Sequence, residues 1–171
     1  LMGGDKAFTR KLDSIFTLPP IFDDSYYGFV IHEIREMQIM DMGNYAHGNQ
    51  PIQHMIYLYD YAGEPAKTQY WVREVMRRLY SDRPDGYCGD EDNGQTSAWY
   101  VFSALGFYPV TPALGQYAIG TPYFREVRLS MPEGKSFVIR ASDPGVPYIQ
   151  SAQLNGKPWE KTYIDYETLR R

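Results

Sequence analysis

Residues Gly89 to Tyr100 read Gly-Asp-Glu-Asp-Asn-Gly-Gln-Thr-Ser-Ala-Trp-Tyr, an acidic turn that runs directly into a helix with apolar spacing. Packing alone gives little reason to place Asp90, Glu91 and Asp92 together, because adjacent carboxylates repel one another. A site that holds a cation or takes a proton from water does give such a reason. Gly94 permits unusual turn angles, and the helix behind it offers free N–H groups to anions. This stretch is a candidate reaction centre.

A structural interpretation of the same turn stays open. Acidic residues cap helix N-termini and favour the helix dipole, so a solvated acidic turn requires no function. An EF-hand is excluded, because counting from Asp90 puts Gly94, Gln95 and Val101 at the fifth, sixth and twelfth loop positions. That loop needs a ligand, a glycine and a glutamate at those positions. Calcium bound at this turn is therefore bound in another way.

Outward from the turn, the apolar spacing predicts that the first two-thirds of the chain is mainly helical. Helices are expected over residues 5–16, 51–63, 65–80 and 95–105, and residues 29–40 are ambiguous between helix and strand. After Pro109, short alternating or β-branched runs predict strands over residues 117–120, 124–131, 136–141, 148–154 and 163–169. We therefore expect an α+β chain, with helices over 1–109 and an antiparallel, sandwich-like β segment over 110–171.

A second polar segment, Tyr45-Ala-His-Gly-Asn-Gln-Pro51, also leads into a helix. Asn49 suits the N-cap position before Gln50 and Pro51, which explains it adequately on structural grounds. Amide oxygens from this segment and carboxylates from the acidic turn would together suit calcium, which prefers oxygen ligands. His47 and His54 are candidates for binding substrate hydroxyls, whereas His32 has no companion motif and is expected to be structural.

The composition excludes several classes of protein. The 171 residues carry a net charge of −4 with scattered cations, which does not favour nucleic-acid binding. No apolar run approaches 18 residues, so no membrane-spanning segment is expected, and the single Cys88 leaves no internal disulfide. No serine lies in a nucleophile motif. The 16 Tyr, 8 Phe and 3 Trp suit either carbohydrate binding or a tyrosine-rich core. Both ends of the chain, at Leu1 and Arg171, look cut, so we expect a fragment.

Several stretches together resemble the exo-acting α-mannosidases of glycoside hydrolase family 92. They are Gly48-Asn-Gln-Pro51 with His54, Tyr61-Ala-Gly63, the acidic turn continued by Ser97-Ala-Trp-Tyr-Val-Phe-Ser-Ala104, Gly106-Phe-Tyr-Pro-Val110 and Ile119-Gly-Thr-Pro122. The resemblance implies an (α/α)6 barrel packed against β domains, of which this chain would supply the last helices and the start of a terminal β region. It further implies calcium-dependent, inverting hydrolysis of mannose-containing oligosaccharides by a secreted, periplasmic or cell-surface bacterial enzyme.

The resemblance also implies roles for individual residues. Asp92 would be the general base, with Asp90 as its partner. Asn49, Gln50 and Asp92 would form the calcium shell, and His47, Asn49 and Glu91 would bind substrate. Inverting chemistry needs a second carboxylic acid as general acid, and the family's glutamate would lie upstream of this chain. The remainder of its own catalytic domain is thus an expected partner, and the isolated chain is expected to be inactive and to bind calcium weakly.

The natural glycan and its linkage stay open. Many α-1,2-specific members carry His-Glu-Gly-Asn-Glu where this chain has Ala46-His-Gly-Asn-Gln50, so an α-1,3 or another linkage is equally compatible. A non-catalytic carbohydrate-binding module is the main alternative. It requires exposed aromatic rings, and Trp159 is its candidate because Trp71 and Trp99 fall on inward helix faces. A structural domain with no site would remain if the two polar segments lay far apart.

Overall fold

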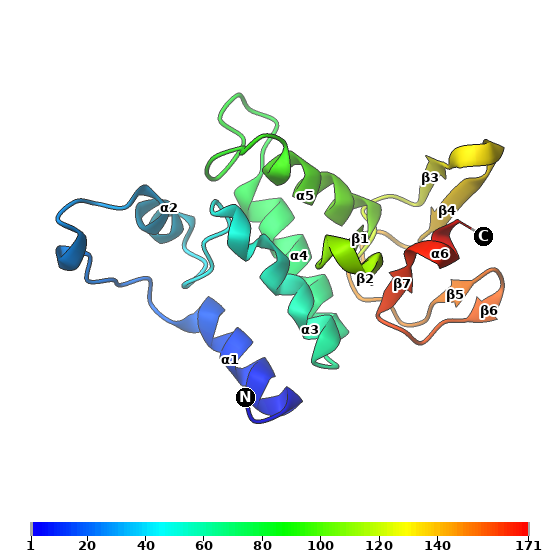
Figure 1. Ribbon diagram of the computed structural model, residues 1–171, viewed down its shortest axis with the longest axis horizontal. Coiled ribbons are helices and arrows are strands. Elements are labelled where there is room, and N and C mark those ends of the chain that lie inside the picture. The colour runs from blue at the N-terminus through cyan, green and yellow to red at the C-terminus, as the bar shows by residue number, and fades with distance from the viewer. Residues whose placement is uncertain (1, 171) are drawn as a thin grey trace.

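The computed structural model describes residues 2–170 and places a group of helices beside small antiparallel sheets (Figure 1). The helices are α1 (Asp5–Thr17), α2 (His32–Met40), α3 (Leu58–Tyr61), α4 (Pro65–Leu79), α5 (Gln95–Leu105) and α6 (Tyr166–Leu169). Short 3₁₀ segments cover Ser25–Tyr27, Gln50–Tyr57, Pro112–Leu114 and Pro132–Gly134. None of the helices within residues 2–170 is long and apolar enough to cross a membrane, and they do not close into a barrel. The expectations for Leu1 and Arg171 lie outside the described residues.

Within residues 2–170 the strands form three separate antiparallel sheets. Strands β1 (Phe107–Tyr108), β2 (Gln116–Ile119) and β7 (Tyr163–Asp165) pair in the order β1-β2-β7. Strands β3 (Glu126–Ser130) and β4 (Ser136–Arg140) form one hairpin, and β5 (Gln153–Leu154) and β6 (Lys157–Pro158) form another. The predicted order of helices followed by strands, an α+β chain, is confirmed. However, β1 precedes residue 110, so the segment expected to hold only helices also supplies an edge strand.

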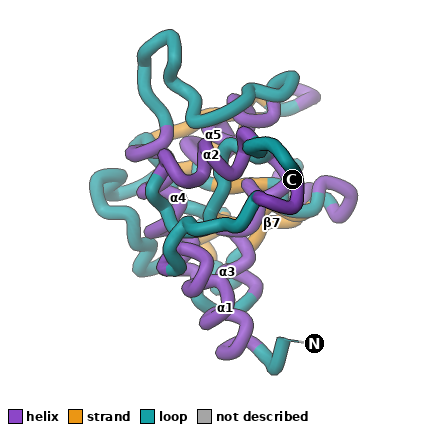
Figure 2. Tube along the Cα trace, turned by 90° about the vertical axis from the view of Figure 1, so that its left-hand side faces the viewer, coloured by secondary structure: helices purple, strands orange, loops and turns teal. Residues whose placement is uncertain are grey.

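The core lies where the 3₁₀ segment, α4 and α5 pack together. The side chains of Tyr57, Val72 and Trp99 are fully buried there, and Tyr57 stacks on Tyr108 from β1. Aromatic rings therefore tie the helical group to the first sheet. Several of the many tyrosines are therefore core residues, which was one of the two interpretations of the composition. In both views α1 stands at the lower edge of the molecule, away from the sheets (Figures 1 and 2).

One arginine joins the helices to the β segment. Arg73 on α4 donates hydrogen bonds from Nη2 to the carbonyl oxygens of Pro122, at 2.6 Å, and Pro144, at 2.8 Å. Its Nε donates to the hydroxyl of Thr121, at 3.3 Å, and its guanidinium lies 4.8 Å from the ring of Tyr123. Because the N–H donors of a guanidinium are fixed relative to one another, these bonds hold the helices and the β segment in one orientation.

Three expected elements differ in the structure. The helix expected over 51–63 is a 3₁₀ segment, Gln50–Tyr57, followed by the single turn α3. The strand expected over 148–154 is reduced to β5, because the N–H of Ile149 donates to the side chain of Gln69 on α4. The strand expected over 163–169 stops at Asp165, where the chain turns into α6 and Tyr166 N–H donates to Gly115 O.

The carboxyl group of Asp60 gives the fold a predicted dependence on pH. Asp60 is 5% exposed, and within residues 2–170 neither carboxyl oxygen has a hydrogen-bond partner. Burial raises its pKa to about 8. The folded chain therefore keeps this proton up to about pH 8, whereas the unfolded chain releases it near pH 4. This group makes the folded state progressively less stable as the pH rises between those values.

We expect Asp60→Asn to flatten that pH dependence, because an amide has the same shape and does not titrate. Between pH 4 and pH 8 the free energy of unfolding of the unmodified protein should fall, relative to the variant, by on the order of a few kcal/mol. Chemical denaturation of both proteins at several pH values measures the difference. Parallel pH profiles would show that the Asp60 carboxyl is ionised in the folded state.

Candidate active site

The acidic turn is held at the start of α5 by the side chain of Glu91. Its Oε2 accepts a hydrogen bond from Gly94 N, at 2.6 Å, and its Oε1 accepts one from the Ser97 hydroxyl, also at 2.6 Å. The Ser97 hydroxyl, followed by the Gly94 N–H, holds the pKa of Glu91 below its usual value. Glu91 was expected to bind substrate, but both of its carboxylate oxygens already bind the helix start. Glu91 therefore has the helix-capping role that was the structural interpretation of the acidic turn.

Asp92 is placed differently from Glu91. Asp92 and Asn93 have φ values of 51° and 54°, so two successive non-glycine residues adopt the left-handed conformation. This conformation is uncommon and is often kept where function requires it. Asp92 is exposed, and no hydrogen bond or ion pair engages its carboxylate in the part of the chain that the structure describes. Its carboxylate does not cap the helix and is available for chemistry.

The two polar segments lie against each other. Gln50 Nε2 donates to Asp90 O, at 2.6 Å, and to the hydroxyl of Thr96, at 3.2 Å. The backbones also touch, because a Cβ added at Gly89 would lie 2.6 Å from the Cα of Gly48. Glycine at both positions thus permits the approach. This contact contradicts the alternative of a structural domain with separated polar segments.

Asn49 and Gln50 keep their amide oxygens available. Asn49 occupies the N-cap position of the 3₁₀ segment as expected, but among residues 2–170 its side chain makes no capping hydrogen bond. The bonds of Gln50 use its nitrogen and leave Oε1 without a partner in the described chain. These two oxygens and the carboxylate of Asp92 are hard ligands of the kind that calcium prefers.

These oxygen atoms are of the type that calcium binds, but they are too few to complete its coordination shell. Calcium takes six to eight oxygens, and residues 2–170 contain no group of three or more His, Cys, Asp or Glu side chains that would hold a metal ion. The amides of Asn49 and Gln50 fall outside such a group. Asn49, Gln50 and Asp92 are therefore the candidate ligands to consider for calcium.

His47 was expected to bind a substrate hydroxyl, and the structure places it in the core. It is fully buried, and its two ring nitrogens hydrogen-bond to the hydroxyls of Tyr45 and Tyr80, each at 2.7 Å. Its ring also lies edge-on to Trp99, with centroids 4.4 Å apart. Burial lowers the pKa of His47 to about 3, so the ring is neutral at neutral pH. Both ring nitrogens are therefore already bonded to tyrosine hydroxyls. The buried ring of His47 packs against Trp99 and helps to hold the segment 45–51 in place.

Helix α2 brings two residues to the site that the sequence did not indicate. The Oε2 of Glu36 lies about 3 Å from the Cβ positions that side chains at Gly48 and Gly89 would occupy. Burial raises the pKa of Glu36, with Asp90 and Glu33 adding to the effect and His32 opposing it. His32 is largely exposed, and its Nε2 lies 3.8 Å from Asp90 Oδ2. His32 was expected to be structural, but it lies beside the acidic turn.

Comparison with known proteins gives a consistent result. The chain is 56% identical to the family GH92 inverting mannosidase BT2199 from Bacteroides thetaiotaomicron, with a TM-score of 0.80, covering 99% of this chain and 23% of that one. It is 36% identical to the family GH92 α-mannosidase BT3965 of the same organism, with a TM-score of 0.81, covering 98% of this chain and 21% of that one.

A fungal relative has also been described, an uncharacterized secreted glycosidase of Arthroderma benhamiae. It is 32% identical over 125 residues, which cover 70% of this chain and 16% of that protein. The chain thus spans less than a quarter of the length of each of these relatives. The model of the glycosyl hydrolase family 92 catalytic domain matches residues 1–171. This match spans the acidic turn, the adjoining Asn49-Gln50 segment and the β segment alike, and the chain belongs to glycosyl hydrolase family 92.

Proposed function

We propose that this chain is the C-terminal part of the catalytic domain of an inverting, calcium-dependent exo-α-mannosidase. It supplies the general base and part of the calcium shell, and its substrates are mannose-containing glycans. The general acid comes from the part of the catalytic domain that lies outside this chain. The enzyme acts outside the cytoplasm, a proposal supported by the description of the fungal relative as secreted.

The observation that carries the proposal is the contact between the two polar segments. The hydrogen bond from Gln50 Nε2 to Asp90 O, which joins the Gln50 amide to the acidic turn, supports the proposal. The relatives support the choice of reaction, since BT2199 is described as an inverting mannosidase and a structure of BT3965 contains mannoimidazole.

In the proposed mechanism, Asp92 accepts a proton from the attacking water. A carboxylate does this only when it is ionised and within hydrogen-bond reach of the water. Asp90 lies two residues away and assists in holding the water, while Glu91 fixes the turn through Gly94 and Ser97. Asn49 and Gln50 present their amide oxygens to the same region. Calcium, when bound, would supply a positive charge that holds sugar hydroxyls.

Hydrolysis of an aryl α-mannoside by the full-length enzyme tests this proposal. The alternative of a carbohydrate-binding module predicts binding without release of the aryl group. That alternative needs exposed aromatic rings, but Trp99 is fully buried and Trp71 stacks on Phe16 with ring centroids 3.8 Å apart. Of the three tryptophans, Trp159 alone remains for it, and it lies far from the acidic turn, so we favour the enzyme.

Removing calcium from the full-length enzyme is expected to lower turnover by about 10²-fold or more, because charge stabilisation by a bound metal ion is worth several kcal/mol. Turnover of an aryl α-mannoside after chelation, and again after adding back calcium or magnesium, measures this. Calcium should restore activity, and magnesium should not, because it prefers a tighter octahedral shell. Full activity after exhaustive chelation would contradict a calcium requirement.

A further inference from the structure

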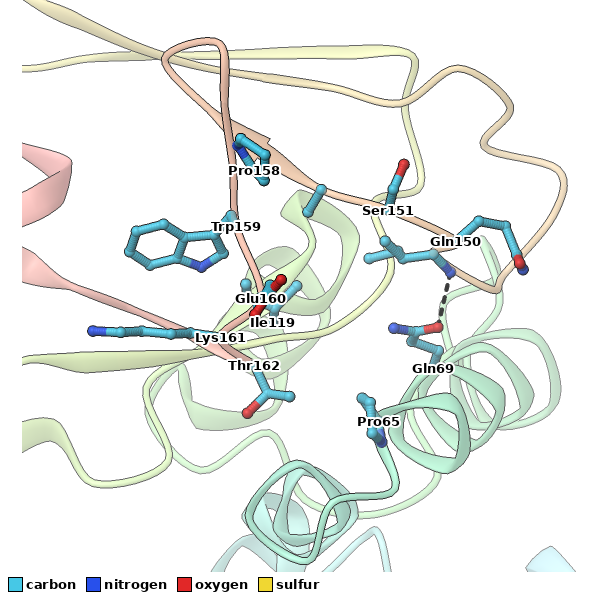
Figure 3. A pocket seen from close by; sticks show the side chains of 12 residues that line it. Pro65, Gln69, Ile119, Gln150, Ser151, Pro158, Trp159, Glu160, Lys161 and Thr162 are labelled. Carbon is cyan, nitrogen blue, oxygen red and sulfur yellow. Dashed lines mark hydrogen bonds between the residues drawn. The ribbon is translucent and has the colours of Figure 1, made fainter.

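A cavity lined by both apolar and polar residues lies at the opposite end of α4 from the acidic turn. Its volume is about 410 Å³, within the range of roughly 300–1,000 Å³ that is usual for small-molecule sites. The start of α4, strand β2 and the segment 149–162 form its walls (Figure 3). Since α4 has 15 residues, this cavity lies about 20 Å along the helix from the acidic turn. It is not part of the candidate active site.

A buried amide points into this cavity. Gln69 is 5% exposed, and its Oε1 accepts a hydrogen bond from Ile149 N, at 3.0 Å. That bond fixes the carboxamide so that the nitrogen turns the other way, into the cavity (Figure 3). In the described chain, Gln69 Nε2 donates no hydrogen bond. This donor faces the solvent-filled cavity, so a ligand oxygen at this position would replace water as its acceptor.

The remaining walls indicate the chemistry of that ligand. Glu160 and Lys161 both line the cavity, so it carries no excess charge and does not favour a free cation or a phosphate. Trp159 also lines the cavity, and the Lys161 ammonium lies 5.5 Å from the centre of its ring. The hydroxyl of Thr162 donates to Asp60 O and keeps its lone pairs available as acceptors. An apolar ring face beside mixed donors and acceptors suits a neutral ligand that carries many hydroxyl groups.

We propose that this cavity binds a hexopyranoside unit of a glycan as a second, non-catalytic carbohydrate site. One face of the sugar packs against Trp159, and one ring or hydroxyl oxygen accepts the hydrogen bond from Gln69 Nε2. The proposal does not depend on the roles of Asp90 and Asp92. Only the choice of a mannoside as the ligand rests on the proposed function.

Such a site would increase the residence of a branched glycan near the active site. Binding one unit of a glycan makes the encounter of a second unit intramolecular, with an effective concentration set by the connecting sugars. A weak site therefore suffices, and a dissociation constant in the millimolar range is expected for a single mannoside.

The test uses the full-length enzyme labelled with 5-fluorotryptophan and titrated with methyl α-mannoside. The Trp159 resonance is assigned by its loss in Trp159→Phe, and the resonances of Trp71 and Trp99 serve as references. We expect a saturable shift of the Trp159 resonance. Gln69→Glu keeps the acceptor for Ile149 N–H and removes the donor, and it should weaken this binding about tenfold. Gln153→Glu, on the exposed strand β5, is the matched control.

Two further measurements complete the test. Trp159→Ala should abolish the weaker of the two binding events seen in a calorimetric titration with methyl α-mannoside, while turnover of a small aryl α-mannoside stays unchanged, since that substrate has no second sugar. Because Trp159 lies on a surface segment, this variant keeps the test possible if Gln69→Glu fails to fold. A Trp159 resonance that does not respond to the mannoside would overturn the proposal, whether or not the enzyme hydrolyses mannosides. Equal affinities of Gln69→Glu and Gln153→Glu would overturn it as well.

Discussion

Asp92→Asn is expected to lower the turnover of mannosides by about 10²- to 10⁴-fold in the full-length enzyme, since this is the usual contribution of a general base. An amide matches the carboxylate in shape but cannot take a proton from water. Asparagine also tolerates the left-handed conformation that residue 92 adopts, so the turn should keep its geometry. Turnover and melting temperature, measured together, check the prediction.

The control for this variant is Asp85→Asn, another exposed aspartate in the loop that precedes α5. It should leave turnover unchanged. If Asp92 served only as a helix cap, asparagine would cap equally well and both variants would be active. Near-normal turnover of Asp92→Asn would therefore assign the base to Asp90 or refute the mannosidase proposal.

Gly89→Ala is expected to reduce turnover by about 10²-fold, because misplacing catalytic groups by about 1 Å has an effect of that size. The added Cβ would lie 2.6 Å from Gly48 Cα and 2.9 Å from both Gly48 O and Glu36 Oε2. Two of these three atoms belong to the backbone, so the turn itself must move away from Asn49 and Gln50. Kinetic measurement of kcat and KM on an aryl α-mannoside checks this effect.

Gly145→Ala is the matched control, since Gly145 also lacks a positive φ and its added Cβ would contact only the Asp143 side chain, at 3.2 Å. This variant should behave like the unmodified enzyme. If Gly89→Ala kept full activity, the close approach of the two segments would have no part in catalysis.

Helices could be predicted from the sequence where residues at their own ends mark the start or the end. Pro65 at the first turn and Gly106 in the left-handed C-cap define α4 and α5, and both elements were expected within one residue of their observed bounds. The segment 148–154 was not predictable as a loop, because its N–H group at Ile149 bonds to Gln69, a residue 80 positions earlier. No local pattern contains that partner.

Some features of the candidate site could likewise be predicted from the sequence, whereas others depend on distant contacts. Two polar segments that each lead into a helix predicted that the side chains of Asn49, Gln50, Asp90 and Asp92 converge, and the structure brings the two segments into contact through Gln50 and Gly89. His47 looked like a binding residue because its neighbours are polar, but the packing of Trp99 and Tyr80 buries it. Glu36 gave no signal, since a single glutamate on a helix is ordinary until the fold brings it against two glycines.

The stereochemistry of hydrolysis tests the central claim most directly. If Asp92 acts as a base on water within an inverting site, the first sugar released from an aryl α-mannoside by the full-length enzyme is β-mannose. Proton NMR during the first minutes of the reaction distinguishes the two anomeric signals before they equilibrate. β-Mannose as the first product is the result that we predict. α-Mannose as the first product would show a retaining mechanism with a carboxylate nucleophile, and would contradict the role proposed for Asp92.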